Sequence, residues 1–303
     1  MHTRMFYAYR RAITLLSVAV VILGIWLLAL SPREKVLEVT FLDVGQGDCI
    51  FVRTPSGRTM LVDGGGRADI PEDETIGLRV VTPFIRSVGL NRIDIVVLTH
   101  PHEDHVQGLI RVLKDFEIGM VLDLAVPHPS QAYTTFLNVI SSRKIDYRKA
   151  LRGQTIDFGD GVQAKILNPP KLHFEGTGDD LNNNSIVLRL TYGHQSVLLA
   201  GDAGIEAEKS MISAGLPLKS TVLKVAHHGS ENATSEEWVR AVSPKVAVIS
   251  AGRNNPFGHP SGNVLRRLEV VGVKVYRTDH GGAIRLKITP SECKVYSFIK
   301  DLR

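Results

Sequence analysis

Residues 93–110 read IDIVVLTHPHEDHVQGLI, and this stretch decides the fold class and the chemistry of the chain. Residues 93–98 have the β-branched, apolar composition of a buried strand. Beyond the polar segment, apolar side chains recur at the spacing of an amphipathic helix, at Val106, Leu109, Ile110, Leu113 and Phe116. The segment between strand and helix, residues 99–105, therefore concentrates three histidines and two acids at the end of a strand.

These side chains have the spacing of a metal site. Two histidines at alternate positions of an extended segment, His100 and His102, can direct both rings at one ion. Asp104 and His105, at the start of the helix, can face a second ion beside the first. Imidazole and carboxylate ligands suit zinc, and also manganese or iron. A solvated loop rich in His and Asp is the alternative interpretation, which the position after a buried strand disfavours.

Composition limits what the rest of the chain can be. The 303 residues are 44% hydrophobic and 22% charged, which is enough apolar material for a globular protein. The formal net charge is +5, but Arg4, Arg10 and Arg11 lie in a short leader, beyond which 33 basic residues face 31 acidic ones. This balance does not indicate a nucleic-acid groove. Cys49 and Cys293 are too few for a disulfide framework, although a single disulfide stays open.

Residues 12–30 predict an uncleaved membrane anchor. The segment is 19 residues long and carries no charge. As a helix it would span about 28 Å, close to the thickness of the hydrocarbon layer of a bilayer. A buried core helix and a cleaved signal peptide are the alternatives. The only small-residue cleavage pattern, residues 29–31, precedes Pro32, which we expect to block processing.

The charges that flank this segment predict its orientation. The three leader arginines should stay cytoplasmic, so the domain that begins at Pro32 is expected on the extracytoplasmic side of the membrane. Arg33 and Lys35 on the other flank leave only a small difference in charge. We therefore expect a cytoplasmic leader and transmembrane anchor over residues 1–31, and one folded domain over residues 32–303.

Beyond the anchor, short apolar runs alternate with helical patterns, and no linker or clear internal repeat divides them. Two sheets covered by helices, a four-layer αβ/βα sandwich of the α+β class, is the expected architecture. Strands are expected at residues 36–42, 50–53, 59–62, 93–98, 186–191, 196–199, 221–226, 245–250, 274–277 and 283–288. Helices are expected after the histidine segment and at residues 75–88, 205–214 and 235–241.

The segment His100-x-His102-x-Asp104-His105 resembles the signature of the metallo-β-lactamase superfamily. Within that superfamily, three further motifs resemble the extracytoplasmic hydrolase domain of the ComEC competence DNA-uptake family. They are FLDVGQGD at residues 41–48, LAGD at 199–202 and KVAHHGS at 224–230. The resemblance covers nearly everything from residue 36 onward. The multi-spanning channel of that family is missing from the sequence, so we expect a stand-alone relative with one anchor.

The resemblance implies roles for two further acids. Asp63 would orient a metal-bound histidine without binding metal itself, and Asp202 would bridge both ions. Each has a simpler alternative, because Asp63 precedes Gly64 as in an Asp-Gly turn and Asp202 is placed where an aspartate caps a turn.

The pair His227-His228 is less easily assigned. Neighbouring strand residues point to opposite faces, so both rings can enter one site only if the strand ends there, as Gly229 suggests. The resemblance implies that His228 binds the second ion and that His227 donates a proton or contacts a phosphate. The two roles can be exchanged, and two merely packed histidines are the alternative.

Many superfamily members carry a further histidine on the first ion, whereas the corresponding residues 180–185 here read DLNNNS. Asn184 or Ser185 is therefore expected to face the first ion or the substrate. Neither His173 nor His194 is expected to be a ligand. The consequence is a more open or more weakly held first ion.

Three more side chains are candidate substrate contacts. Gln46 and Asp48 lie in the loop of the FLDVGQGD motif, with support of the turn as the alternative role. His259 lies in the motif NNPFGHP at residues 254–260, with a surface-loop histidine as the alternative.

These residues predict metal-assisted hydrolysis in which two divalent ions, Zn²⁺ or Mn²⁺, share a hydroxide. Asp104 and Asp202 would balance the charge of the ions, and His227 would protonate the leaving group. We expect a phosphodiesterase or nuclease that acts on DNA or on a cell-envelope phosphoester. The 6% aromatic content offers little base stacking for DNA. The alternatives are a metal-binding but inactive module of a DNA-uptake or envelope assembly, and lactamase or lactonase chemistry on the same fold.

Overall fold

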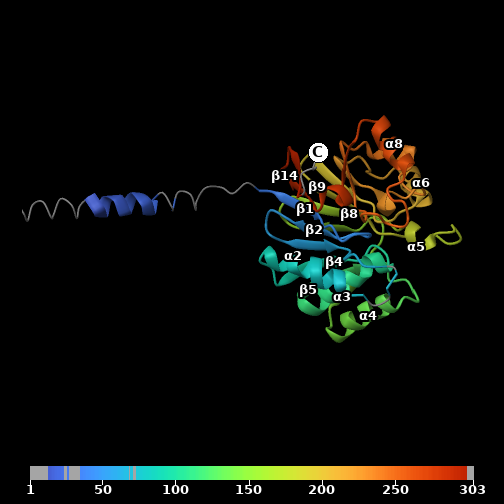
Figure 1. Cartoon of the computed structure of the whole chain (residues 1–303), viewed down its shortest axis with the longest axis horizontal. Helices are drawn as coiled ribbons and strands as arrows, with labels where there is room; N and C mark the ends of the chain where they lie inside the picture. Colours follow the sequence, from blue (N-terminus) through green and yellow to red (C-terminus); the bar gives the residue numbers. More distant parts are fainter. Residues whose placement is uncertain (1–12, 24–25, 27–34, 68, 71–72, 299–303) are drawn as a thin grey trace, which may run out of the picture. The chain divides into compact units, whose positions relative to one another are not determined.

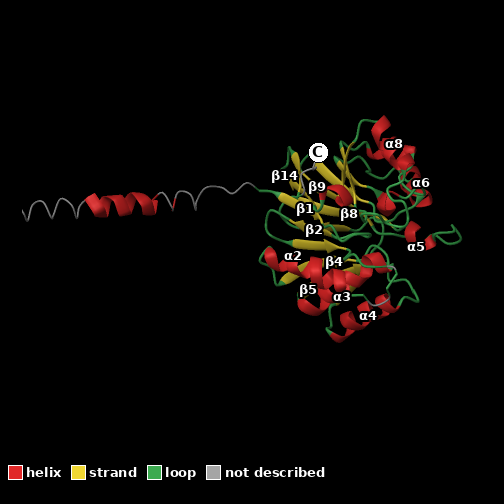
Figure 2. Ribbon diagram, viewed as in Figure 1, coloured by secondary structure: helices red, strands yellow, loops and turns green. Residues whose placement is uncertain are grey.

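The computed structural model describes residues 13–23, 26, 35–67, 69–70 and 73–298, which fall into two units, Met1–Lys35 and Val36–Arg303. In the first unit, residues 13–23 and Trp26 are helical (Figure 2). Among the described residues, no helix is both long and apolar enough to cross a membrane. The other residues of the expected anchor, and the three leader arginines, lie outside the described residues.

Within the described part of the second unit, the strands form two sheets. The first sheet has the order β15-β14-β1-β2-β3-β4-β5-β6. Its strands are β1 (Leu37–Phe41), β2 (Ile50–Arg53), β3 (Thr59–Val62), β4 (Arg92–Val97), β5 (Glu117–Asp123), β6 (Asp146–Lys149), β14 (Ile284–Ile288) and β15 (Cys293–Ser297). The second sheet has the order β13-β12-β11-β10-β9-β8-β7. Its strands are β7 (Thr155–Asp157), β8 (Val162–Asn168), β9 (Val187–Tyr192), β10 (Gln195–Leu199), β11 (Val222–Lys224), β12 (Val246–Ile249) and β13 (Lys274–Arg277).

Helical segments connect the strands, and the longer ones cover the outer faces of both sheets (Figure 1). They are η1 (Gly77–Val81), α2 (Thr82–Ser87), α3 (Glu103–Asp115), α4 (Gln131–Ser142), α5 (Asp180–Asn183), α6 (Ile205–Ser213), η2 (Ala226–Gly229), α7 (Glu236–Val242), α8 (Gly262–Val270) and α9 (Thr278–Gly281). Figure 1 shows α2, α3 and α4 on one side of the two sheets and α6 and α8 on the other. The four-layer αβ/βα sandwich expected from the sequence is therefore confirmed.

The alternation of side chains along the strands explains these layers. In β4, Ile95 and Val97 point to the core between the sheets, where they join Leu188 of β9. Val96 points the opposite way and packs against Leu109 of α3. Because successive strand residues face opposite sides, an apolar run such as IVV supplies both layers of packing at once.

Most of the expected elements are present, and two differ in a way that matters. The expected helix over 75–88 is divided into η1, a stretch of π-helix, and α2. The expected strand over 221–226 ends already at Lys224, and a short 3₁₀ turn, η2, follows it. That early end determines where the paired histidines point.

The strand order gathers the candidate site residues at one edge. β3 and β4 are parallel neighbours, and so are β10, β11 and β12. Because the carboxyl ends of parallel strands meet at the same edge of a sheet, the loops that leave these strands lie close together. Asp63 follows β3, His100 follows β4, and Asp202 follows β10.

Candidate metal centre

His100 and His102 lie in the extended segment between β4 and α3. His102 has the dihedral angles φ −70° and ψ 152° and directly precedes the helix. The Nε2 atom of His100 lies 2.9 Å from the Nδ1 atom of His102. Both rings therefore converge on one point, as the His-x-His spacing predicts. His100 is completely buried, whereas His102 also lines a hollow at the surface.

His105 lies in the first turn of α3 and is held from behind by Asp63. Its Nδ1 atom is 2.8 Å from Oδ2 of Asp63. The same carboxylate accepts hydrogen bonds from the backbone N–H and the hydroxyl of Thr99, both at 2.7 Å. This leaves Nε2 of His105 facing Oδ2 of Asp202 at 3.3 Å. Asp63 thus has the geometry of an orienting acid, while its φ of 58° also makes it the turn residue of the alternative interpretation.

The turn after β11 brings both paired histidines to the same side. His227 and His228 have left-handed backbone angles, with φ values of 48° and 55°. As a result, Nε2 of His228 lies 3.4 Å from Oδ2 of Asp202 and 3.4 Å from Oδ2 of Asp104. Nε2 of His227 lies 3.9 Å from the same oxygen of Asp202. The alternation rule of a strand does not apply here because the strand has already ended.

The donor atoms fit a pair of divalent cations. His100, His105 and Asp202 offer ligand atoms within 4.8 Å of one another, and so do Asp104, His105 and His228. Among the described residues, Nε2 of His105, Nε2 of His228 and Oδ1 of Asp202 are buried without a hydrogen-bond partner. Buried polar atoms are normally paired, so unpaired ligand atoms that converge on one place are what a metal centre requires.

The charges of the cluster lead to the same conclusion. Burial opposes a positive charge on His105, but Asp202 and Asp63 outweigh burial and hold its pKa well above the usual value. Burial also opposes a charge on His228, yet Asp202 and Asp104 raise its pKa to about 9. The carboxylates therefore draw positive charge into a buried space, and bound cations would supply it.

Four side chains to which the sequence assigned other roles or none support the ligands. Thr99 binds Asp63, as described above. Lys224 of β11 is completely buried and forms an ion pair with Asp48. Oδ1 of Asp48 in turn lies 3.7 Å from Nδ1 of His228. In the sequence, the feature that could have indicated this buried pair is a lysine within an apolar strand. Ser185, expected near the first ion, instead accepts a hydrogen bond of 3.3 Å from the backbone N–H of Asp202.

A hollow of about 240 Å³, the central hollow, opens over the cluster. Four candidate ligands line it: His102, Asp104, Asp202 and His228. Three of the expected substrate contacts line it as well: Gln46, His227 and His259. The rings of His227 and His259 are 5.7 Å apart. Substrate contact by these side chains stays a prediction. Their position at the wall of the central hollow is compatible with it.

Asn184 is not brought into the central hollow. Its side-chain amide accepts from the backbone N–H of Phe174 and donates to the carbonyl oxygens of Phe174 and Asp180. Both the oxygen and the nitrogen of the amide are therefore engaged in hydrogen bonds within its own loop. Asn182, two residues earlier, lines the hollow instead, and so does Phe257. Sequence position alone does not distinguish between the three consecutive asparagines.

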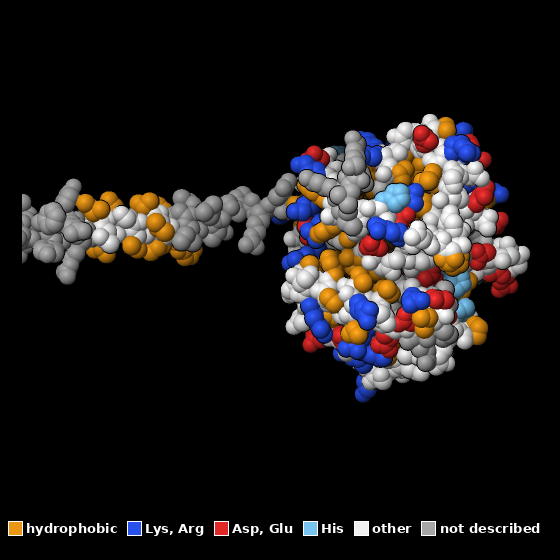
Figure 3. All heavy atoms as spheres, viewed as in Figure 1, with side chains coloured by type: hydrophobic (Ala, Val, Ile, Leu, Met, Phe, Trp, Pro, Cys, Tyr) orange, Lys and Arg blue, Asp and Glu red, His pale blue; other side chains and the backbone are white. Residues whose placement is uncertain are grey.

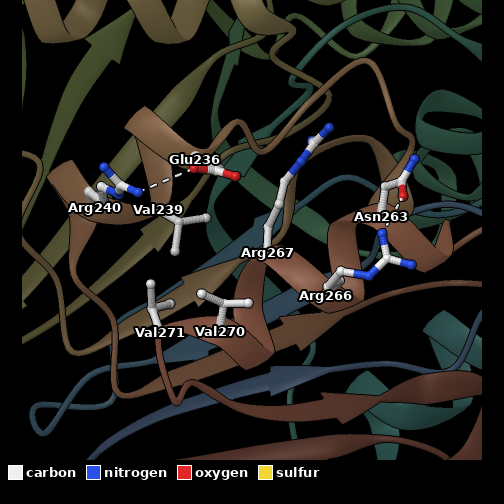
Figure 4. A pocket seen from close by; sticks show the side chains of 8 residues that line it. All are labelled: Glu236, Val239, Arg240, Asn263, Arg266, Arg267, Val270 and Val271. Atoms are coloured by element: carbon white, nitrogen blue, oxygen red, sulfur yellow. Dashed lines mark hydrogen bonds and ion pairs between the residues drawn. The ribbon is translucent and has the colours of Figure 1, made fainter.

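A different hollow, of about 280 Å³, lies between α7 and α8 (Figure 4). Val239, Val270 and Val271 line it, and Arg240 forms an ion pair of 3.2 Å with Glu236. The residues that line it include no histidine and only one carboxylate, so it offers no ligand set for a metal ion.

Comparison with known proteins gives relatives that cover most of the chain. The chain is 32% identical over 260 residues to ComE operon protein 3 of Bacillus subtilis, covering 82% of this chain and 33% of the relative. It is 29% identical over 271 residues to competence protein ComA of Neisseria gonorrhoeae, covering 88% of this chain and 35% of the relative. These are competence proteins of the ComEC family, as the sequence motifs indicated. The chain spans about a third of their length.

Solved structures agree on the fold. CmlA, a diiron β-hydroxylase from Streptomyces venezuelae, superposes with a TM-score of 0.51 at 19% identity, covering 88% of this chain and 55% of CmlA. The metallo-beta-lactamase fold protein YhfI from Bacillus subtilis superposes with a TM-score of 0.51 at 13% identity, covering 81% of this chain and 98% of YhfI. Residues 42–253 match the family described as the Metallo-beta-lactamase superfamily, and the chain belongs to that superfamily.

Proposed function

We propose that the chain is a metal-dependent phosphodiesterase that uses two divalent ions, zinc or manganese. Six side chains would hold the ions: His100, His102, Asp104, His105, Asp202 and His228. When bound, such ions polarise a phosphoryl oxygen and lower the pKa of a water molecule. The observation that carries the proposal is the set of unpaired, buried ligand atoms beneath an open hollow.

The protein side chains would supply orientation and the proton. Asp63 fixes the ring of His105 through Nδ1, so that Nε2 is directed into the cluster. His227 and His259 face the central hollow from one side, where they can bind the phosphate oxygens of a diester. Nε2 of His227 is the atom from which a proton can pass to the leaving oxygen.

The identity of the diester is part of the proposal. The names of three relatives, two competence proteins and recombination protein 2 of Haemophilus influenzae, favour a DNA-related substrate. The surface gives DNA less support, because basic and acidic side chains are interspersed on the face of the domain that Figure 3 shows. A cell-envelope phosphoester is therefore the second candidate. No observation favours lactamase or lactonase chemistry.

Hydrolysis of bis-p-nitrophenyl phosphate by the purified full chain in mild detergent tests the activity. We expect turnover with Mn²⁺ or Zn²⁺, loss of turnover in a chelator, and recovery when the ion is restored. A double variant, His102→Ala with Asp104→Ala, serves as the matched control because both ions lose a ligand. Wild-type protein that turns over no faster than this variant refutes the proposal. Metal binding without turnover of any phosphoester would favour the inactive module.

We further propose that residues 12–30 anchor the chain and that the domain faces the extracytoplasmic space. The uncharged segment and the three leader arginines support this proposal. A reporter enzyme that is active only outside the cytoplasm, fused after the last residue, should be active in cells. A silent fusion, with a cytoplasmic reporter active at the same position, would overturn the orientation.

A further inference from the structure

A third and larger hollow, the side hollow, adjoins the candidate metal centre. Its volume of about 470 Å³ lies within the range of about 300–1,000 Å³ typical of small-molecule pockets. Gln46, Asp104 and Phe257 line both this hollow and the central hollow. Because Asp104 is a candidate ligand, a phosphodiester held at the ions would place one of its two ester groups next to the side hollow.

The walls of the side hollow are close-packed and mostly apolar. Val44, Ile76 and Pro256 contribute apolar side chains. Two glycines allow the surrounding loops to approach one another. A Cβ atom on Gly252 would lie 2.8 Å from the backbone nitrogen of Gln46, and one on Gly66 would lie 2.0 Å from the carbonyl oxygen of Glu103. Polar side chains, among them Asn254 and Asn255, also line the hollow, so its walls suit a flat ring with polar edges.

Phe257 stands where the two hollows meet, with 57% of its surface exposed. Its ring packs against the ring of His259, with the centroids 5.8 Å apart and an angle of 27° between the planes. Contact of an exposed aromatic ring with water is unfavourable, and the ring is well suited to stack against another flat ring. It lies beside the hollow into which the ester group would enter.

A cation is available at the wall of the side hollow. Arg253 donates from Nε to the backbone carbonyl of Asp279 at 3.2 Å. The carboxylate of Asp279 is bound by Arg277. Arg67, the other arginine of this hollow, is paired at 2.8 Å with Asp69. Arg253 is therefore the better placed of the two to attract an anionic substrate.

We propose that the side hollow is a nucleoside subsite, in which Phe257 stacks on the base that is attached to the scissile phosphate. The inference rests on the proposed phosphodiesterase activity and selects nucleotide diesters over envelope phosphoesters. Stacking of a base on an aromatic side chain is worth about 1–3 kcal/mol, which corresponds to a factor of about 5 or more.

Two chromogenic esters that release the same p-nitrophenolate test this subsite in the full chain. One is the p-nitrophenyl ester of thymidine 5′-phosphate, and the other is methyl p-nitrophenyl phosphate. We expect kcat/KM to be about 5-fold or more higher for the nucleoside ester. Phe257→Ala should collapse this ratio, and Phe257→Tyr should retain it. Phe298→Ala is the matched control, because Phe298 is 60% exposed, contacts Arg285 and lines neither hollow.

A binding measurement separates this inference from the proposed function. Thymidine 5′-monophosphate and methyl phosphate are titrated calorimetrically into the metal-loaded chain and its Phe257→Ala variant. Nucleotide binding that weakens about 5-fold or more in the variant supports the subsite even if neither ester is hydrolysed. Equal kcat/KM values for the two esters overturn the inference, and so does nucleotide binding that Phe257→Ala leaves unchanged. In that case the phosphodiesterase activity can still stand.

Discussion

At the scale of single residues, the candidate ligands are oriented by side chains that do not line the central hollow. Asp63 and Thr99 fix His105, and Ser185 positions the backbone of Asp202. Such supporting hydrogen bonds determine which ring nitrogen faces the site, and ligands whose orientation is fixed lose less entropy on binding. The buried pair of Lys224 and Asp48 is the most costly of these supports, because two charges are withdrawn from water.

Lys224→Met tests that cost. The variant leaves the carboxylate of Asp48 buried without its cation, so we expect the free energy of unfolding to fall by about 3–5 kcal/mol. Adding Asp48→Asn should recover much of the loss, because no charge then remains buried. Urea unfolding of the full chain, with chelator present throughout, measures both effects. If Lys224→Met costs no more than Lys219→Met, at an exposed lysine, the pair is not needed for stability.

At the scale of elements, α6 is joined to α7 through one buried acid. Glu208 of α6 accepts hydrogen bonds from the backbone N–H groups of Thr234 and Ser235, at 2.5 and 3.0 Å. Ser235 directly precedes α7, and its side chain accepts from the N–H of Trp238. The first turn of α7 therefore depends on this carboxyl group.

The same acid makes stability depend on pH. Burial raises the pKa of Glu208 to about 7, against about 4.3 for an unfolded glutamate. The folded state therefore favours the protonated form. The contribution of the protonated carboxyl group to the free energy of unfolding is therefore complete below pH about 4. It is lost as the pH rises to about 7, by about 1.4 kcal/mol per pH unit.

Glu208→Gln should abolish this part of the pH dependence. Between pH 4.5 and 8, the wild-type free energy of unfolding should fall relative to the variant by on the order of 3 kcal/mol. Urea unfolding at both pH values, in chelator, gives the difference. Glu206→Gln, at an exposed position on the same helix, is the control and should follow the wild type. A wild-type-to-variant difference that is equal at both pH values would rule out this role.

Strands that are bounded by turn residues or apolar runs could be predicted from the sequence, whereas two polar edge strands could not. β2, β3 and β13 were expected at their observed bounds because turn residues or apolar runs delimit them. β6, which reads DYRK with every residue exposed, lies at an edge of its sheet and has no apolar face to recognise. β7 lies at the edge of the other sheet, with two of its three residues exposed.

The candidate site likewise has a part that could be predicted from the sequence and a part that could not. The segment from His100 to His105 is local in sequence, so its chemistry could be predicted before the fold. The Lys224–Asp48 pair joins residues 176 positions apart, and only the packing of the two sheets brings them together. Phe257 was passed over because a single aromatic in a loop carries no pattern. Asn184 was selected by position alone, and the direction of its amide depends on the loop around Phe174.

At the scale of the molecule, the candidate ligands come from both halves of the sandwich. His100, His102, Asp104 and His105 follow β4 of the first sheet, whereas Asp202 and His228 follow β10 and β11 of the second. Bound ions would therefore connect two sheets whose main contact is an apolar core. Because a ligand that binds only the folded state stabilises it by RT ln(1 + [L]/Kd), the ions should raise the stability of the whole domain.

Thermal unfolding of the metal-free chain, with and without Zn²⁺ or Mn²⁺, measures this coupling without any substrate. At an ion concentration about 100-fold above Kd, we expect a gain of about 2.7 kcal/mol, and an increase in Tm of several degrees that a chelator reverses. Asp202→Ala removes the carboxylate that faces both His105 and His228, so its Tm should respond far less to either ion. His194→Ala, in the turn between β9 and β10, is the histidine control and should respond like the wild type. If the ions raise the Tm of Asp202→Ala as much as that of the wild type, the stabilising metal binds elsewhere and not at this cluster.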